Sequence, residues 1–150
     1  MDDPFLEALA KGGFQVGALA RAYYPEGILV NEVTNQAALE KTSALLELES
    51  CTLFEAAIQT GPFLVRIDIL KKNGNCLELI EVKAKSFHPD ADSFLTNKGK
   101  ISSNWRSYLT DVAFQEMVLK QAFPGVTIDC FLMLAEKSKA ATVDGLKSKI

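Results

Sequence analysis

The residues of this chain that could do chemistry gather in two neighbouring apolar runs. The first run, VRIDIL (65–70), contains Asp68, and the second, LELIEVKAKS (77–86), contains Glu81 and Lys83. Carboxylates supply the oxygen ligands that Mg²⁺ prefers. A lysine beside them can stabilise negative charge that develops during a reaction. This combination of residue types favours a metal-dependent hydrolytic site.

The link between the two runs, KKNGNC, predicts a β-hairpin. Asn-Gly is a strong signal for a two-residue hairpin turn, and it occurs here at 73–74. With these residues at the centre of the turn, Asp68 faces Leu79 and Arg66 faces Glu81. Side chains alternate between the two faces of a strand. One face of the hairpin is then expected to carry Arg66, Asp68, Leu79, Glu81, Lys83 and Lys85.

The other face of this hairpin is almost purely aliphatic and is expected to lie in the core. It carries Val65, Ile67, Ile69, Ile80, Val82 and Ala84. In the predicted register, Asp68 and Glu81 are diagonal neighbours with Cα atoms roughly 7–8 Å apart. A hard cation could link their carboxylates. The alternative is an ordinary solvent-facing strand surface, on which mixed charges only keep the protein soluble.

The composition is that of a soluble globular protein. The 150 residues, of which 48% are hydrophobic and 23% charged, suit one domain (1–150) with a core of ordinary size. The formal net charge of -3 gives no global basic field, so a nucleic-acid partner would need local basic patches. No signal peptide and no apolar run of about 18 residues is present. We expect a cytoplasmic protein without membrane contact.

The cysteines exclude two further classes of site. Cys51, Cys76 and Cys130 are far apart, odd in number and without a CxxC pair. A disulfide framework or an iron–sulfur cluster within this chain is therefore not expected. Reduced thiols suit a cytoplasmic location.

The elements that must position the acids form an α/β pattern. Asp3-Pro4 opens a short helix, and Thr34 and Asn104 are expected to cap two longer ones. Helices are expected over 14–23, 34–49 and 104–123, with strands over 52–59, 63–70, 77–84 and 126–134. Residues 28–33 could add a short strand. The order predicts a central mixed four-stranded sheet, an antiparallel meander plus one strand after a crossover helix, flanked by helices.

The two acidic runs resemble the signature of the PD-(D/E)XK nuclease superfamily. There an Asp and an (Asp/Glu)-x-Lys lie on adjacent strands. Here the pattern reads Asp68, twelve intervening residues and Glu81-Val82-Lys83. The resemblance implies a restriction-endonuclease-like core and a phosphodiester-cleaving activity.

Two flanking residues extend the resemblance to the RecB-like branch. Glu55, in TLFEAAIQTGPFLVRID, stands where such members carry an acidic residue, and Gln115, in YLTDVAFQEMVL, stands where they carry a glutamine. Over about residues 13–146 the chain looks like an uncharacterised bacterial family near the CRISPR-associated RecB-like exonucleases. Relatives of this kind usually continue further, so the chain is compatible with being one domain of a longer protein.

The resemblance implies roles for these residues. Mg²⁺ or Mn²⁺ would be held by Asp68, Glu81 and the Val82 carbonyl, with Glu55 completing this site or holding a second ion. Lys83 would orient or help deprotonate the attacking water and stabilise the developing charge. Gln115 would hydrogen-bond to Lys83 or to the substrate backbone. The residues assigned to catalysis are Asp68, Glu81, Lys83 and Gln115.

Basic and aromatic residues near these runs could contact the substrate. A basic rim suited to phosphates is expected from Lys85, Lys98, Lys100 and Arg106. Trp105 and Tyr108 could stack on a base. Surface solubility or core packing is the alternative for each of them.

The leading hypothesis is a divalent-metal-dependent nuclease domain that acts on nucleic acid, with DNA as the expected substrate. A catalytically inactive nuclease-fold domain that binds nucleic acid or a protein partner is the first alternative. A structural or oligomerisation module, with the charges on a solvated strand face, is the second.

Overall fold

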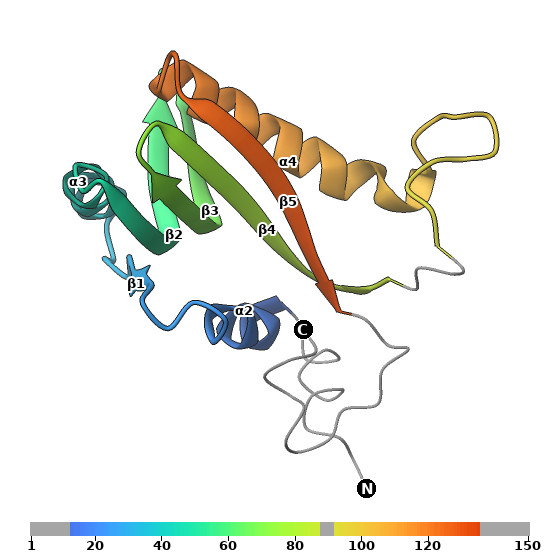
Figure 1. Cartoon of the computed structure of the whole chain (residues 1–150), viewed down its shortest axis with the longest axis horizontal. Helices are drawn as coiled ribbons and strands as arrows, with labels where there is room; N and C mark the ends of the chain where they lie inside the picture. Colours follow the sequence, from blue (N-terminus) through green and yellow to red (C-terminus); the bar gives the residue numbers. More distant parts are fainter. Residues whose placement is uncertain (1–12, 88–91, 136–150) are drawn as a thin grey trace, which may run out of the picture.

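A five-stranded mixed sheet with helices on both faces forms the part of the chain that the computed structural model describes, residues 13–87 and 92–135 (Figure 1). The strands lie across the sheet in chain order. They are β1 (Ile28–Leu29), β2 (Ser50–Thr60), β3 (Phe63–Asn73), β4 (Cys76–Ser86) and β5 (Thr127–Ala135). The helices are α2 (Gly13–Arg21), α3 (Asn35–Leu45) and α4 (Ser103–Ala122).

The predicted topology is confirmed for four of the strands, but the sheet has a fifth. β2, β3 and β4 form an antiparallel meander, and β5 pairs with β4 in parallel after the crossover through α4. β1 pairs in parallel with β2 through Ile28 and Leu29 alone. The predicted count of four strands was therefore one too few, whereas the short strand considered possible over 28–33 is present at Ile28–Leu29.

Local signals placed the helices well. α3 follows Thr34 as predicted, and the Thr34 side chain accepts a 3.2 Å hydrogen bond from the Ala37 amide. α4 begins one residue earlier than expected and has Ser102, not Asn104, at its N-cap. The helix expected at Asp3 lies outside the described residues.

The turn between β3 and β4 is displaced by one residue from its predicted place. Asn73 faces Cys76, so Gly74 and Asn75 are the central residues, and Gly74 has a φ of 57°. Glycine at the first central position is typical of a type II′ turn. The displaced turn is held from outside the hairpin: the Gly74 amide donates to Glu49 O at 2.8 Å, and the Thr127 amide donates to Asn75 O at 3.0 Å.

β2 and β3 both break their alternation at the same level. Leu53 and Leu70 pack on the α4 side and Phe54 and Ile69 on the α2 side. Beyond the break, the residues on the α4 side are Ala56, Ile58, Ile67 and Val65. Phe54 pairs with Ile69 before the break, and Ala56 pairs with Ile67 after it, so the register between the strands is unchanged. Each strand therefore has one extra residue between these two pairs. These residues are Glu55, with a φ of 57°, and Asp68.

This break overturns the predicted assignment of faces. The aliphatic residues expected on one face are divided, because Val65 and Ile67 pack toward α4 whereas Ile69, Ile80 and Val82 pack toward α2. On β4 the predicted face is kept, because Leu79, Glu81 and Lys83 all lie toward α4, so the error is confined to β3. The alternation rule fails here because it assumes that no strand residue is extra.

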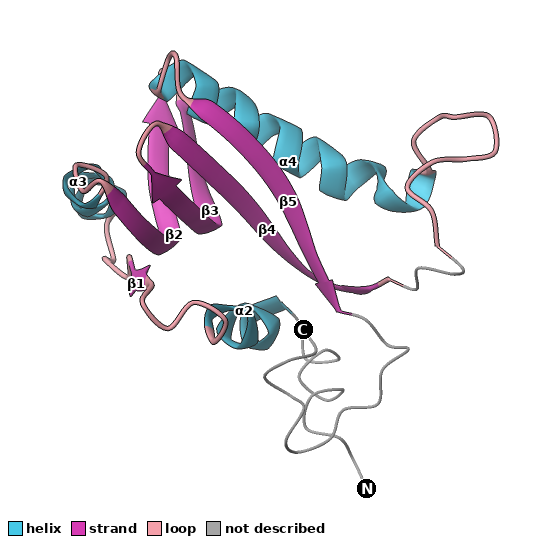
Figure 2. Ribbon diagram, viewed as in Figure 1, coloured by secondary structure: helices cyan, strands magenta, loops and turns pink. Residues whose placement is uncertain are grey.

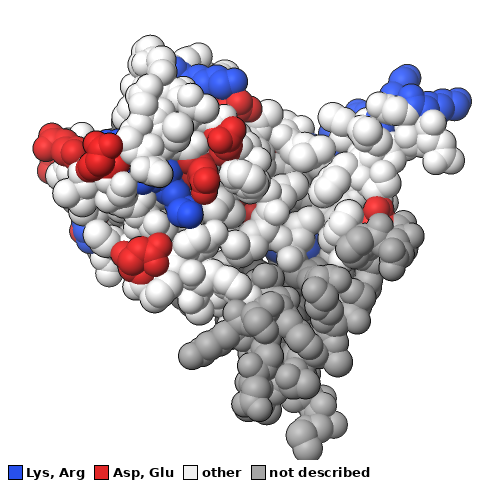
Figure 3. All heavy atoms as spheres, in the orientation of Figure 1, with Lys and Arg blue, Asp and Glu red and all other residues white. Residues whose placement is uncertain are grey.

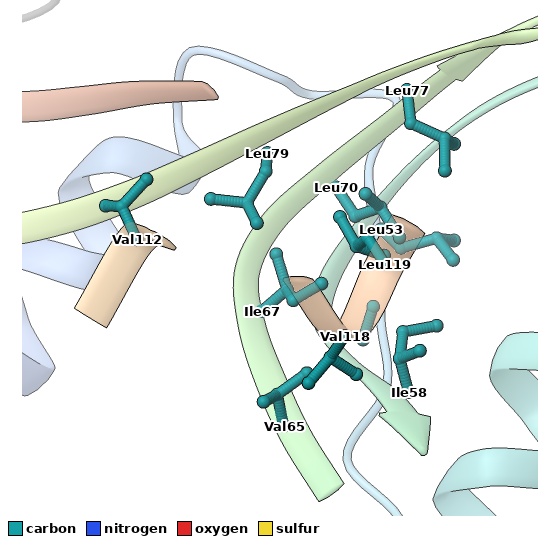
Figure 4. Close-up of a cluster of buried hydrophobic side chains, with 11 residues drawn as sticks. Leu53, Ile58, Val65, Ile67, Leu70, Leu77, Leu79, Val112, Val118 and Leu119 are labelled. Carbon is teal, nitrogen blue, oxygen red and sulfur yellow. The ribbon is translucent and has the colours of Figure 1, made fainter. Parts of the chain in front are cut away.

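Helices lie on both sides of the sheet (Figure 2), and an apolar cluster packs on each face. The α4-side cluster joins the sheet to Val112, Val118 and Leu119 of that helix (Figure 4). On the other face, Ala20 of α2 packs with Phe54, Ile69 and Ile80. Within the described ranges, no helix has the length and apolar character needed to cross a membrane.

Candidate functional site

Asp68 lies where β3 and β4 separate. From the hairpin turn, the backbone pairing of these strands extends as far as Ile69 and Ile80. At the next level, Asp68 Oδ2 accepts a 2.8 Å hydrogen bond from the Val82 amide. The Asp68 carboxylate thus accepts the hydrogen bond that the Val82 amide would otherwise donate to a backbone carbonyl of β3. The two strands part here, and the Asp68 carboxylate is fixed in the opening between them.

Glu81 is held from the other side by α4. Glu81 is buried, with 8% of its surface exposed. Its Oε2 atom accepts a 2.8 Å hydrogen bond from Gln115 Nε2. Gln115 was predicted to bond Lys83 or the substrate, and the bond goes to Glu81 instead. The Gln115 Oε1 atom is buried and has no hydrogen-bond partner among the residues that the structure describes.

Lys83 lies between two carboxylates. Its Nζ atom is 3.2 Å from Glu81 Oε1 and 3.2 Å from Asp111 Oδ2, and it lies 5.3 Å from the centre of the Tyr108 ring. Burial disfavours the ammonium charge, but the hydrogen bonds and charges of Glu81 and Asp111 outweigh it and raise the pKa of Lys83. Lys83 therefore remains a cation near neutral pH, which suits charge stabilisation better than proton abstraction.

The Asp68 carboxylate lies in an environment that disfavours its charge, chiefly because it is buried. Burial, together with the nearby carboxylates of Glu81 and Glu55, raises the pKa of Asp68 to about 6, against the opposing effects of the Val82 amide and the Lys83 ammonium. A bound cation would relieve this repulsion.

A cavity of about 440 Å³ opens beside Asp68 on the α2 side of the sheet. Its charged lining residues are Arg21, Glu32, Glu55, Arg66 and Asp68. Arg66 does not face Glu81 as predicted. Its Nε atom donates to Glu55 O at 2.9 Å and its Nη2 atom to Val30 O at 2.8 Å. Arg66 therefore fixes the backbone of Glu55, which has the uncommon positive φ.

The structure brings the predicted site residues together in two groups. Glu55, Asp68 and Val82 line the cavity, whereas Glu81, Lys83 and Gln115 are linked by hydrogen bonds on the α4 side. Among residues 13–87 and 92–135, no three His, Cys, Asp or Glu side chains converge closely enough to hold a metal ion.

Two of the predicted substrate contacts have structural roles. Lys85 Nζ donates to Asn104 O at 2.8 Å and lies 4.5 Å from the centre of the Trp105 ring. Trp105 is 2% exposed and contacts the rings of Phe87 and Phe94. Of the two readings left open for Trp105, the structure therefore supports core packing over stacking on a base, because the ring is buried.

The remaining basic residues are accessible. Lys98 and Lys100 lie in a loop closed by a bridge between Leu95 and Ile101. This loop projects from the body of the protein, and Figure 3 shows positive charge at its tip. Arg106 is exposed on the first turn of α4.

Two charged residues of the site were missed in the sequence. Asp111 precedes Gln115 by four residues, a spacing that places both on one helix face, and this signal could have identified it. Arg21 lies in the last turn of α2 and lines the cavity. Its place in the cavity wall depends on how α2 packs, and no local pattern reveals that.

None of the protein-family models, curated proteins and solved structures compared with this chain matches it.

Proposed function

We propose that the protein is a divalent-metal-dependent nuclease domain that hydrolyses phosphodiester bonds, with DNA as the expected substrate. The observation that carries the proposal is the opening between β3 and β4, where Asp68 meets Val82 and where Glu81, Lys83 and Gln115 are linked. Under this proposal the sheet is a restriction-endonuclease-like core and the protein acts in the cytoplasm.

The donor set fits a hard cation such as Mg²⁺ or Mn²⁺. Asp68 and Glu81 would hold the ion, with Glu55 approaching from the cavity. The N–H and C=O of a strand residue point to the same side, so the Val82 carbonyl is directed, like its amide, toward β3. Mg²⁺ commonly uses one or two carboxylates and keeps several waters, so a cluster of three acidic side chains is not required.

The chain's own residues would divide the work of hydrolysis. When bound, the metal ion would activate a water and neutralise phosphate charge. Lys83, held as a cation, would stabilise the charge that develops on the phosphate. Gln115 would fix the orientation of Glu81, and the Val82 amide would fix Asp68.

Phosphates outside the catalytic opening would meet the exposed cations. Lys98, Lys100 and Arg106 are exposed and suit contacts to the nucleic-acid backbone, which do not read sequence. Lys85 is held against α4 by its bond to Asn104 O and lies over the ring of the half-buried Tyr108 of that helix. These two residues would contribute by shaping the wall of the site.

The decisive experiment is cleavage of labelled single- and double-stranded DNA and RNA with Mg²⁺ or Mn²⁺. Asp68→Ala and Lys83→Ala should abolish product formation. Asp129→Ala and Lys71→Ala are matched controls, because both residues lie outside the opening. They should retain activity. Cleavage that survives in Asp68→Ala would disprove this assignment.

A second function is favoured by one observation. Both Glu81 oxygens are already engaged, by Gln115 and Lys83, as would suit an inactive nuclease-fold domain that binds nucleic acid or a protein partner. Binding of DNA without cleavage under any metal condition would favour this alternative.

A further inference from the structure

The engagement of Glu81 poses a problem for metal binding. Gln115 Nε2 holds Oε2 at 2.8 Å, and Lys83 Nζ holds Oε1 at 3.2 Å. A cation that binds the Glu81 carboxylate must compete with one of these two donors. The donor that yields is the one that has another partner.

Lys83 has such a partner and Gln115 does not. Asp111 Oδ2 lies 3.2 Å from Lys83 Nζ, the same distance as Glu81 Oε1. The Asp111 side chain is 54% exposed, whereas that of Glu81 is 10% exposed. The Tyr108 ring also lies against the Lys83 ammonium. Lys83 can therefore leave Glu81 and keep both an ion pair and a ring contact.

Gln115 would lose more by moving. It is buried, and its Oε1 atom already lacks a hydrogen-bond partner within the described part of the chain. If Nε2 also left Glu81, a second buried polar atom would be unsatisfied, which is costly. Gln115 therefore stays on Oε2, and Oε1 is the oxygen that becomes available.

We propose that Asp111 is a positioning residue that draws Lys83 away from Glu81 and so releases Glu81 Oε1 for the metal ion. This inference rests on the proposed function. Without Asp111, Glu81 is the one carboxylate among the described residues that remains paired with Lys83. Lys83 then competes more strongly with the cation for Glu81 Oε1. Asp111 thus acts through Lys83, with no contact to the metal.

The test is a double-mutant cycle on metal affinity, measured by titration calorimetry with Mn²⁺ in the absence of nucleic acid. Asp111→Ala should weaken binding about fivefold, a coupling of the size found between contacting residues. In a Lys83→Met background, the same substitution should change the affinity by less than about twofold. Asp111→Glu keeps the carboxylate and should restore most of the affinity.

Glu116→Gln is the matched control. It removes one negative charge from the same helix, and Glu116 pairs with Lys120 at 2.7 Å and not with Lys83. Its Mn²⁺ affinity should stay within about twofold of wild type, because a screened surface charge has little effect. Circular dichroism establishes that each variant is folded.

The possible failures are distinguishable. A weakening by Asp111→Ala that persists in the Lys83→Met background would overturn the inference, because Asp111 would then attract or bind the ion directly. An equal loss in Glu116→Gln would also overturn it, by showing a general charge effect. Absence of Mn²⁺ binding by the wild type would overturn the proposed function, and this inference with it.

Discussion

Gln115 Nε2 donates a 2.8 Å hydrogen bond to Glu81 Oε2 and thereby joins the middle of α4 to β4 at the candidate site. Both residues are 8% exposed. A buried carboxylate without such a donor would be costly. The bond therefore has a stability consequence as well as a functional one.

Replacing Gln115 by Leu should destabilise the fold. The substitution removes the donor to Glu81 and leaves a buried charged group less well satisfied, with an expected loss of about 1–3 kcal/mol in the free energy of unfolding. Urea denaturation followed by circular dichroism measures it. Gln121→Leu, at an exposed position of α4, is the control. Equal stabilities of the two variants would contradict the role given to this bond.

Asp68→Asn should stabilise the metal-free protein at neutral pH. Because the folded protein holds the Asp68 proton more tightly, with a pKa of about 6 against an ordinary value of 3.8, wild-type stability falls as pH rises through this window. Below the window the carboxyl is protonated in both states and contributes nothing. The variant should therefore exceed wild type above pH 6 by an amount on the order of 1–2 kcal/mol, and the difference should disappear near pH 3.

Thermal unfolding between pH 3 and pH 8 measures this difference. Added Mg²⁺ should raise the melting temperature of wild type but not that of Asp68→Asn, since only the wild type has the carboxylate to bind the ion. If Asp68→Asn is less stable than wild type at pH 7.5 without metal, the conclusion that the protein disfavours the charged Asp68 carboxylate is wrong.

Trp105→Ala should destabilise the protein and loosen the loop that precedes α4. The ring is 2% exposed and contacts Phe87, Phe94 and Lys85, so a loss of about 3–5 kcal/mol is expected. Unfolding curves and limited proteolysis of the loop measure it. Phe131→Ala, at a half-exposed position of β5, should cost much less. A fully stable Trp105→Ala variant would restore the ring as a candidate for base stacking.

Removing Lys98 and Lys100 together should weaken DNA binding in a salt-dependent way. If each lysine contacts one phosphate, the slope of log affinity against log salt should decrease by roughly 2. Fluorescence anisotropy, with Ca²⁺ in place of Mg²⁺, measures this slope without cleavage. The control removes Lys71 and Lys120, which are paired with Glu78 and Glu116. The same slope in both double variants would exclude a specific role of the loop.

Local patterns predicted the elements but not their exact relation. The Thr34 cap, the strand runs and the crossover helix depend on neighbouring residues, and each was confirmed. The hairpin register was wrong because Gly74 bonds Glu49 and Asn75 bonds Thr127, partners that are distant in the sequence. For Trp105 the sequence left base stacking and core packing both open, and the contacts of Phe87 and Phe94 with its ring decide for packing.

The candidate site was predictable in its residue types and less so in its contacts. Asp68, Glu81 and Lys83 lie near the same opening, as their spacing indicated. Gln115 and Asp111, the partners of Glu81 and Lys83, come from α4. The orientation of that helix follows from the packing of Val112, Val118 and Leu119. For this reason the Asp111–Lys83 pair and the Gln115–Glu81 bond required the three-dimensional structure, although the spacing of Asp111 and Gln115 could have marked Asp111 as a candidate.

The paired irregularity at Glu55 and Asp68 has a meaning for how this sheet could have arisen. If both residues were deleted, β2 and β3 would alternate without interruption, and every aliphatic side chain would keep its present face. Deleting only one of them would shift the pairing of β2 with β3 by one residue on one side of the break. The side chains in that half of the strand would then point to the opposite face of the sheet. The two acids are thus a matched pair of extra residues, and the apolar packing of the sheet does not depend on their side chains.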